Sequence, residues 1–246
     1  MHLLDGVILR VAFYVGIHMK KRLRTFRLPN FALGGVTVAV MMLSAATVNA
    51  QPVCPGALLM NKGDTVVTGA GAFGDCTGTA VASTLLASLS VPFTTSTGFG
   101  SGTLISAVYR ENASGTLDFY YQVVLNTTST NCGAAGQPAC DPLARLTAAN
   151  FNNGGNWTTW AATRGDAVGP FSAGTAFPIT ADRNAVGDVV GFSFNPPDGA
   201  KIQPGQTSAI LIISTNATTF ATGNASVIDG GATTVSAFEP DSPPSN

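Results

Sequence analysis

The stretch from Gly187 to Phe238 constrains the fold most, because four short runs rich in Val, Ile and Phe follow one another there. The runs are GDVVGFSFN, TSAILIIST, NASVID and TTVSAF, and turn residues separate them. Each run is shorter than an ordinary helix and is bounded by Pro, Gly, Asn or Asp, a pattern typical of β-strands. This stretch therefore predicts the core of a β-sandwich.

A second pair of strands is predicted at Gly102–Glu111 and Gly115–Asn126. The residues Glu111 to Gly115 between them predict a hairpin. Side chains alternate along both runs with a period of two, which favours a sheet with one face in water.

The remaining segments give weaker signals for strands. Residues 64–68 (DTVVT) predict a short strand, and residues 84–95 (TLLASLSVPFTT) predict an edge strand because of Pro92. Residues 126–186 are the least regular part of the sequence. The fold class predicted is all-β, an antiparallel β-sandwich of jelly-roll or immunoglobulin-like type.

The amino-terminal part has the features of a secretory signal peptide. A basic stretch begins at Met19, an apolar stretch runs from Phe31 to Ala46, and small residues at Val48 and Ala50 suit signal peptidase. We expect a helical signal peptide cleaved after Ala50. Residues 1–18 are then either an extension before a true start at Met19 or a long amino-terminal region. The alternative is an uncleaved membrane anchor. Residues 51–246 are predicted to form a single secreted domain without stable membrane insertion.

The net charge of the chain changes once residues 1–50 are removed. Six Lys and Arg then face twelve Asp and Glu, a net charge of −6. Nucleic acid and anionic membranes attract clustered basic residues, so neither is an expected partner. His2 and His18 also lie in the removed part, which excludes Ser-His-Asp and Cys-His catalysis in the mature chain. A Ser-Lys site would use Lys62 or Lys201, and neither lies in a recognisable motif.

The four cysteines, Cys54, Cys76, Cys132 and Cys140, all lie in the exported part. An even number in an oxidising compartment favours two disulfides over a metal site, and three pairings exist. The Gly- and Pro-containing loop between Cys132 and Cys140 suits a short bridge. We therefore favour Cys132 with Cys140 and Cys54 with Cys76, the alternative being free thiols.

Three segments resemble a known family: GSGTLISAVYRENASGTLDFYYQV, ADRNAVGDVVGFSF and IQPGQTSAILIISTNATTFATGNASVIDGGATTVSAFEP. Over about Leu85 to Pro240 the chain resembles exported bacterial surface proteins of the PEP-CTERM, exosortase-sorted kind. Such proteins end in a Pro-Glu-Pro motif, an apolar helix and a basic tail. This sequence ends at DSPPSN after Glu239-Pro240, so we expect no sorting helix. The resemblance implies a bacterial exported surface or matrix protein and transfers no catalytic residue.

Acidic residues offer two candidate ligand sites. Glu111 and Asp118 across the predicted hairpin form a carboxylate pair of the kind that a glycosidase needs, although solvated turn residues are the simpler interpretation. Asp182, Asp188 and Asp198 surround one strand and would suit a structural Ca²⁺, but they form no regular ligand run. No cofactor and no catalytic residue are predicted.

Aromatic residues give the alternative binding hypothesis. Trp157 and Trp160 follow a polar Asn-Gly run, and with Tyr120 and Tyr121 they would offer a platform for sugars, although such aromatics more often belong to a core. The sequence therefore predicts a secreted, non-enzymatic structural or extracellular-matrix protein that contacts extracellular polysaccharide or other surface proteins. A carbohydrate-binding module is the alternative, and a carboxylate-pair hydrolase is the third hypothesis.

Overall fold

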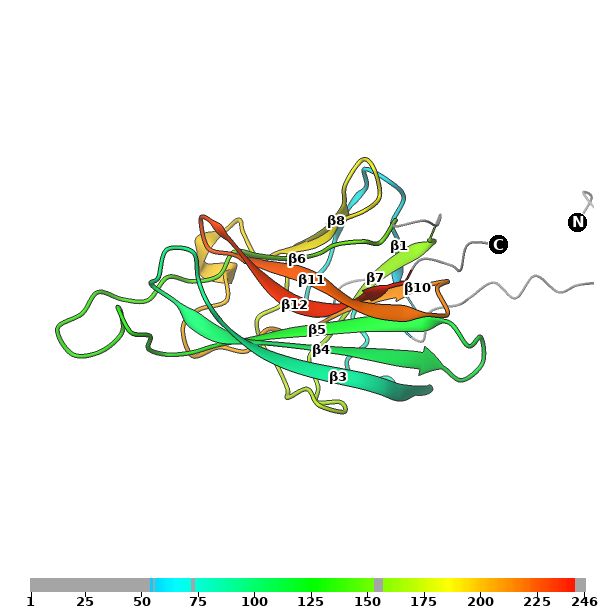
Figure 1. Cartoon of the computed structure of the whole chain (residues 1–246), viewed down its shortest axis with the longest axis horizontal. Helices are drawn as coiled ribbons and strands as arrows, with labels where there is room; N and C mark the ends of the chain where they lie inside the picture. Colours follow the sequence, from blue (N-terminus) through cyan, green and yellow to red (C-terminus); the bar gives the residue numbers. More distant parts are fainter. Residues whose placement is uncertain (1–53, 55, 72–73, 153–156, 242–246) are drawn as a thin grey trace, which may run out of the picture. The chain divides into compact units, whose positions relative to one another are not determined.

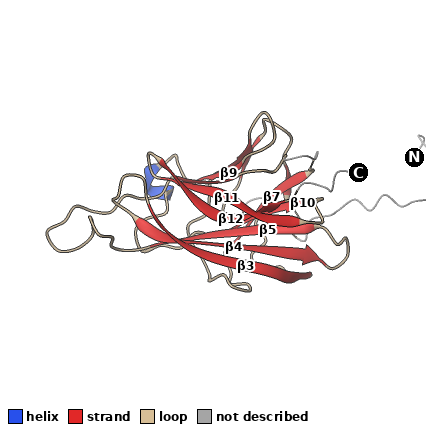
Figure 2. Ribbon diagram, viewed as in Figure 1, coloured by secondary structure: helices blue, strands red, loops and turns tan. Residues whose placement is uncertain are grey.

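The computed structural model describes residue 54 and residues 56–71, 74–152 and 157–241. All of them belong to one compact unit. Within these residues the regular structure is twelve β-strands and one 3₁₀ turn, η1 (Asp198–Ala200). Figure 2 shows that strand dominates the fold. The expected signal peptide, with its cleavage point and its anchor alternative, lies outside the described residues. Among the described residues, no helix is long and apolar enough to cross a membrane.

Two six-stranded antiparallel sheets make up the fold, and the long strands β3, β4 and β5 are clearest in Figure 1. The first sheet has the order β1 (Leu58–Leu59), β7 (Thr159–Arg164), β10 (Ile210–Thr215), β5 (Leu117–Leu125), β4 (Ser101–Glu111) and β3 (Ser83–Thr94). The second has the order β12 (Ala232–Pro240), β11 (Phe220–Ile228), β6 (Arg145–Ala148), β9 (Val190–Ser193), β8 (Thr180–Arg183) and β2 (Thr65–Val67). The prediction of an all-β sandwich is confirmed.

The main hydrophobic core lies between the sheets. Alternate residues of each strand point into it, as the period of two requires. The first sheet contributes Leu104, Val108, Phe119, Tyr121, Leu211 and Ile213, and the second contributes Leu146, Phe192, Val227 and Val235. Phe119 meets Phe151 edge to face at 5.6 Å between ring centroids. The fourth and fifth strands and the last three strands therefore supply much of the core, as their alternation predicted.

The predicted hairpin is present between β4 and β5. Gly115 has a φ of +76° there, which glycine adopts at no steric cost, and the Glu111 amide donates to the Thr116 carbonyl at 2.9 Å. The prediction that residues 84–95 form an edge strand is also confirmed, because β3 pairs with β4 alone. Pro92 is tolerated there because an edge strand leaves alternate amides outside the ladder.

Two expectations need correction. Residues 126–186 are not simply irregular, since they hold β6, β7 and β8. Their strands are only four to six residues long and rich in Ala, Thr and Arg, so periodicity gives little signal. The hairpin of β4 and β5 also does not have a wet face. Eight of the nine residues of β5 are buried, because loops cover the outer face of the first sheet, which is the face turned away from the second sheet.

Both predicted disulfides are present. Cys54 pairs with Cys76 at a Cα separation of 5.5 Å, and Cys132 pairs with Cys140 at 4.9 Å. The first bridge is buried with Tyr109, Tyr120 and Phe171 on the outer face of the first sheet. This disulfide therefore holds part of the cover that closes that face.

Candidate functional site

The outer face of the first sheet carries a row of polar and aromatic side chains across four strands. Strand register places Tyr109 opposite Asp118, Asp118 opposite Ser214, and Ser214 opposite Trp160. Directly opposed residues in antiparallel strands project from the same face and lie within side-chain reach. The row therefore brings together residues that are more than 100 positions apart in the sequence.

Asp118 lies at the centre of this row and is 1% exposed. Neither of its carboxyl oxygens has a hydrogen-bond partner of ordinary geometry. Burial raises the pKa of Asp118 to about 8, the Ser214 hydroxyl offsets only part of that rise, and the negative charge of Glu111 adds to it. This raised pKa favours the protonated, neutral form of the Asp118 carboxyl group at pH 7.

Glu111 is the second carboxyl group of the cluster. It is 4% exposed and accepts a hydrogen bond from the Ser114 hydroxyl at 2.6 Å, and Ser114 in turn lies 2.7 Å from the Thr116 hydroxyl. Glu111 and Asp118, the pair proposed for glycosidase chemistry, are thus both enclosed by protein. The structure therefore buries both carboxyl groups, and Asp118 is the one whose pKa burial raises.

Two tyrosines pack beside the carboxyl groups. The rings of Tyr109 and Tyr120 are 4.6 Å apart, and Phe171 stacks on Tyr120 at 6.0 Å. The Tyr109 hydroxyl is buried with no hydrogen-bond partner. Gly169 approaches this hydroxyl so closely, with a φ of +55°, that a Cβ there would overlap it. Burial raises the pKa of Tyr109, and the positive charge of Arg164 opposes that shift.

Arg164 supplies the positive charge at the edge of the cluster. It pairs with Asp166 at 2.6 Å. Burial raises the pKa of Asp166, but the hydrogen bond and charge of Arg164 outweigh it, so this pKa lies below its ordinary value. The Arg164 Nε and one Asp166 oxygen are buried without partners. Unpartnered polar atoms thus concentrate on this face, whereas most buried polar groups in proteins are hydrogen-bonded.

Two loop segments, residues 74–77 and residues 165–175, close the cluster from outside and together form the cover of the first sheet. In the amino-terminal one, the Cys76 amide donates to the Thr163 carbonyl at 2.7 Å, and the Thr163 amide donates to Gly74 at 2.9 Å. In the segment after β7, the Gln122 side chain donates to the Ser172 carbonyl at 2.7 Å and accepts from the Ser172 amide at 3.1 Å. The cover is therefore fastened to β7 and β5 by direct hydrogen bonds.

The four aromatic residues of the sugar-platform hypothesis do not share one surface. Tyr120 faces outward under the cover and is 2% exposed, whereas Tyr121 faces the inter-sheet core and is 0% exposed. The Tyr121 hydroxyl donates to the Phe238 carbonyl at 2.6 Å and so links the two sheets. Trp157 and Trp160 are half-buried. Only the tryptophans therefore retain contact with solvent.

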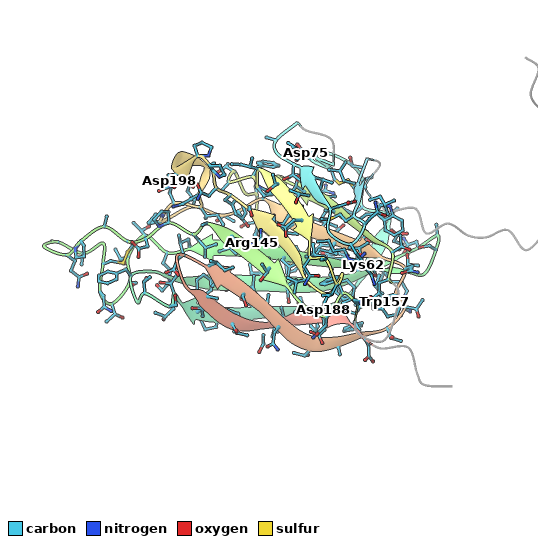
Figure 3. The ribbon with its side chains drawn as sticks, turned by 90° about the horizontal axis from the view of Figure 1, so that it is seen from above. Lys62, Asp75, Arg145, Trp157, Asp188 and Asp198 are labelled. Atoms are coloured by element: carbon cyan, nitrogen blue, oxygen red, sulfur yellow. A yellow bond between two sulfur atoms is a disulfide. The ribbon has the colours of Figure 1, made fainter. Side chains whose placement is uncertain are left out.

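The three aspartates proposed for Ca²⁺ are separate. Asp182 pairs with Arg145 at 2.6 Å, and Asp198 pairs with Lys201 at 2.9 Å. Asp198 lies well away from Asp188 in Figure 3. Within the part of the chain that the structure describes, no three His, Cys, Asp or Glu residues are grouped as metal ligands.

Arg183 is a buried polar residue that sequence reasoning missed. It is 4% exposed, and its guanidinium donates to four backbone carbonyls, those of Met60, Phe151, Trp157 and Gly187, at 2.9–3.1 Å. These carbonyls belong to three separate chain segments. An arginine after a short Thr-Ala-Asp run gave no sign of this role.

Comparisons with protein-family models, with curated proteins and with solved structures each found no match.

Proposed function

We propose that this chain is an exported bacterial surface or matrix protein that acts as a structural or interaction module. The observation that carries the proposal is the Cys54–Cys76 disulfide, which is buried with Tyr109, Tyr120 and Phe171 on the outer face of the first sheet. Disulfides form and persist mainly in oxidising compartments outside the cytoplasm. The signal-peptide pattern and the resemblance to PEP-CTERM proteins support the same compartment.

The first test concerns export. The full chain, expressed with its own leader in a bacterial host, is expected in the periplasm or medium with Gln51 as its first residue. Edman sequencing and a thiol count under denaturing, non-reducing conditions check both points. A full-length cytoplasmic product with four free thiols would contradict the proposal.

The second test concerns the matrix role. The exported protein is expected to co-sediment with extracellular polysaccharide or with surface-protein fractions from its host, and heat-denatured protein serves as the control for trapping. Recovery only in the soluble medium, with no enrichment in either fraction, would contradict a matrix role while leaving export intact.

Carbohydrate binding remains the second candidate, because Trp157 and Trp160 keep part of their surface in solvent. Register also places Leu59, which is 49% exposed, opposite Trp160 on the same face. Affinity electrophoresis in polysaccharide gels tests this candidate with the variants Trp160→Ala and Trp157→Ala. Retardation that both substitutions abolish would support it, and unchanged mobility of the unsubstituted protein in all gels would exclude it for those sugars.

A further inference from the structure

The sandwich has four sheet edges, and they are protected unequally. Edge strands expose unpaired backbone groups, and proteins protect them by shortness, charge, proline or cover. Strands β1 and β2 are two and three residues long. Strands β12 and β3 have nine and twelve residues. Only the two long edges therefore offer an extended ladder to another chain.

Strand β12 is capped by side chains from the facing sheet. The Phe238 carbonyl accepts from the Tyr121 hydroxyl at 2.6 Å, and the Phe238 amide donates to the Ser106 hydroxyl at 3.3 Å. These are backbone groups that point away from β11. The edge of β12 is thus partly satisfied within the molecule.

Strand β3 pairs on one side with β4, and no other described strand pairs with its second side. Across the turn that joins β3 to β4, the Thr95 amide donates to the Gly100 carbonyl, so Thr95 faces β4. The Thr94 carbonyl accepts from the Thr233 hydroxyl and so points to the side away from β4. Backbone groups alternate in direction along a strand. The amides and carbonyls of Ser88 and Ser90 therefore point away from β4, as does the carbonyl of Pro92.

The free part of this edge is short and bounded. A register shift between Leu85 and Ala87 interrupts the ladder at one end, and Pro92 removes an outward amide at the other. The segment between them, LASLSV from Leu86 to Val91, carries no charge. In the β3 edge as a whole, twelve residues contain no Lys, Arg, Asp or Glu, the residues that usually discourage edge pairing.

The same segment is chemically symmetric about Leu89. Serines lie on either side of it at 88 and 90, and small apolar residues lie beyond them at 87 and 91. A two-fold axis at Leu89 would place Ser88 opposite Ser90 of the partner subunit, and Ser90 opposite Ser88 of the partner subunit. The backbone groups of the two residues in each pair would be hydrogen-bonded to each other. Leu89 would then face Leu89 of the partner subunit. Because Leu89 is half-buried on the core side of β3, this contact extends the core between the sheets.

We propose that β3 is the contact strand of a homodimer, in which two copies pair antiparallel through residues 86–92 and join their first sheets into one continuous sheet. The self-complementary sequence selects a second copy over an unrelated peptide. Each copy has one such edge, so the contact is isologous and closes at two subunits. The proposal holds whether or not the protein is a matrix component.

The first experiment measures mass against concentration for the exported full chain. Sedimentation equilibrium from about 1 μM to about 1 mM is expected to show a monomer–dimer equilibrium. Ser90→Pro removes an outward amide while leaving the bonds to β4, as Pro92 already does two residues on. It is expected to weaken the dimer by about 100-fold through two lost hydrogen bonds. Val67→Glu, at the exposed edge strand β2, is the matched control and leaves the equilibrium unchanged.

The second experiment fixes the register. Leu89→Cys is expected to form an intersubunit disulfide on export, because directly opposed residues at a two-fold axis lie within disulfide reach. Ser90→Cys is the control and stays unlinked, since Ser90 faces Ser88 of the partner subunit. Peptide mapping distinguishes the new bridge from the native ones. A monomer at every concentration would overturn the proposal, as would a dimer that Ser90→Pro leaves intact and Leu89→Cys does not cross-link.

Discussion

The two faces of the first sheet are both buried, but different kinds of side chain occupy them. On the inner face, Phe119 and Tyr121 of β5 pack in an apolar core, and the Tyr121 hydroxyl has a partner in the other sheet. On the outer face, Asp118 and Tyr120 of the same strand lie under loops. Sheet packs against sheet on one side, whereas a disulfide-bonded cover closes the other. The comparison shows that burial alone does not make an environment apolar or its polar groups satisfied.

The largest expected effect is the pH dependence caused by Asp118. Its folded pKa of about 8 exceeds its ordinary value of 3.8, so the folded state binds more protons between those values and stability falls as pH rises through that window. The loss of stability is at most about 6 kcal/mol by linkage and levels off above pH 8. Urea unfolding from pH 4 to pH 9 measures it, with Asp118→Asn as the variant that lacks this component. Parallel pH profiles for the two proteins would contradict the assignment.

The inner face is tested by Phe119→Ala. Removing this fully buried ring, which packs edge to face on Phe151, is expected to cost about 4 kcal/mol through lost burial and a cavity. Val124→Ala, at a half-buried outward position of the same strand, is the matched control and costs about 1 kcal/mol. Chemical denaturation at pH 6 gives both values. Equal costs would mean that the two faces of β5 contribute alike.

The cover is tested by replacing Cys54 and Cys76 together with serine. Loss of this bridge is expected to cost about 3 kcal/mol on the chain-entropy account. Hydrogen exchange should quicken at residue 76 and Thr163, whose amides bond between the cover and β7, while amides of β5 stay protected. The double serine variant at Cys132 and Cys140 is the control, with an expected cost of about 2.5 kcal/mol and no change at those two amides. Loss of protection throughout β5 would show that cover and core unfold as one unit.

The smallest effects separate two tyrosine hydroxyls. Tyr121→Phe leaves the Phe238 carbonyl without its donor and is expected to cost about 1 kcal/mol, whereas Tyr109→Phe removes a buried hydroxyl that has no partner and is expected to be neutral or slightly stabilising. Thermal unfolding of both variants at one pH measures the difference. A larger loss for Tyr109→Phe would reveal a hydrogen bond to that hydroxyl in solution.

Sequence periodicity predicted the inner face well, because Phe119, Tyr121 and Val123 alternate with other residues along β5. It failed for the outer face, since alternation does not distinguish a face in water from one covered by an aperiodic loop. Strand β7 (TWAATR) was missed for a related reason. It is only six residues long and has two adjacent Ala residues, which have little strand preference, so its pairing with β10 determines its conformation.

The candidate site was predictable only in part. The predicted hairpin between Glu111 and Gly115 indicated that Glu111 and Asp118 lie near each other. In the structure both side chains are buried. The sugar-platform hypothesis combined Tyr120 with Tyr121, although consecutive residues of a strand point to opposite faces. Ser214 and Arg164 join the cluster through pairings across more than 40 residues, which no local pattern indicates.

The way in which Arg183 is held has a consequence for the environments that the protein tolerates. Its positive charge is stabilised by carbonyl dipoles of three chain segments, and among the described residues no carboxylate forms an ion pair with it. Acid does not protonate these carbonyls, and dissolved salt screens a buried group weakly. The hydrogen bonds of the Arg183 guanidinium are therefore expected to keep their strength at high salt concentration and at low pH, where ion pairs such as Arg145–Asp182 weaken.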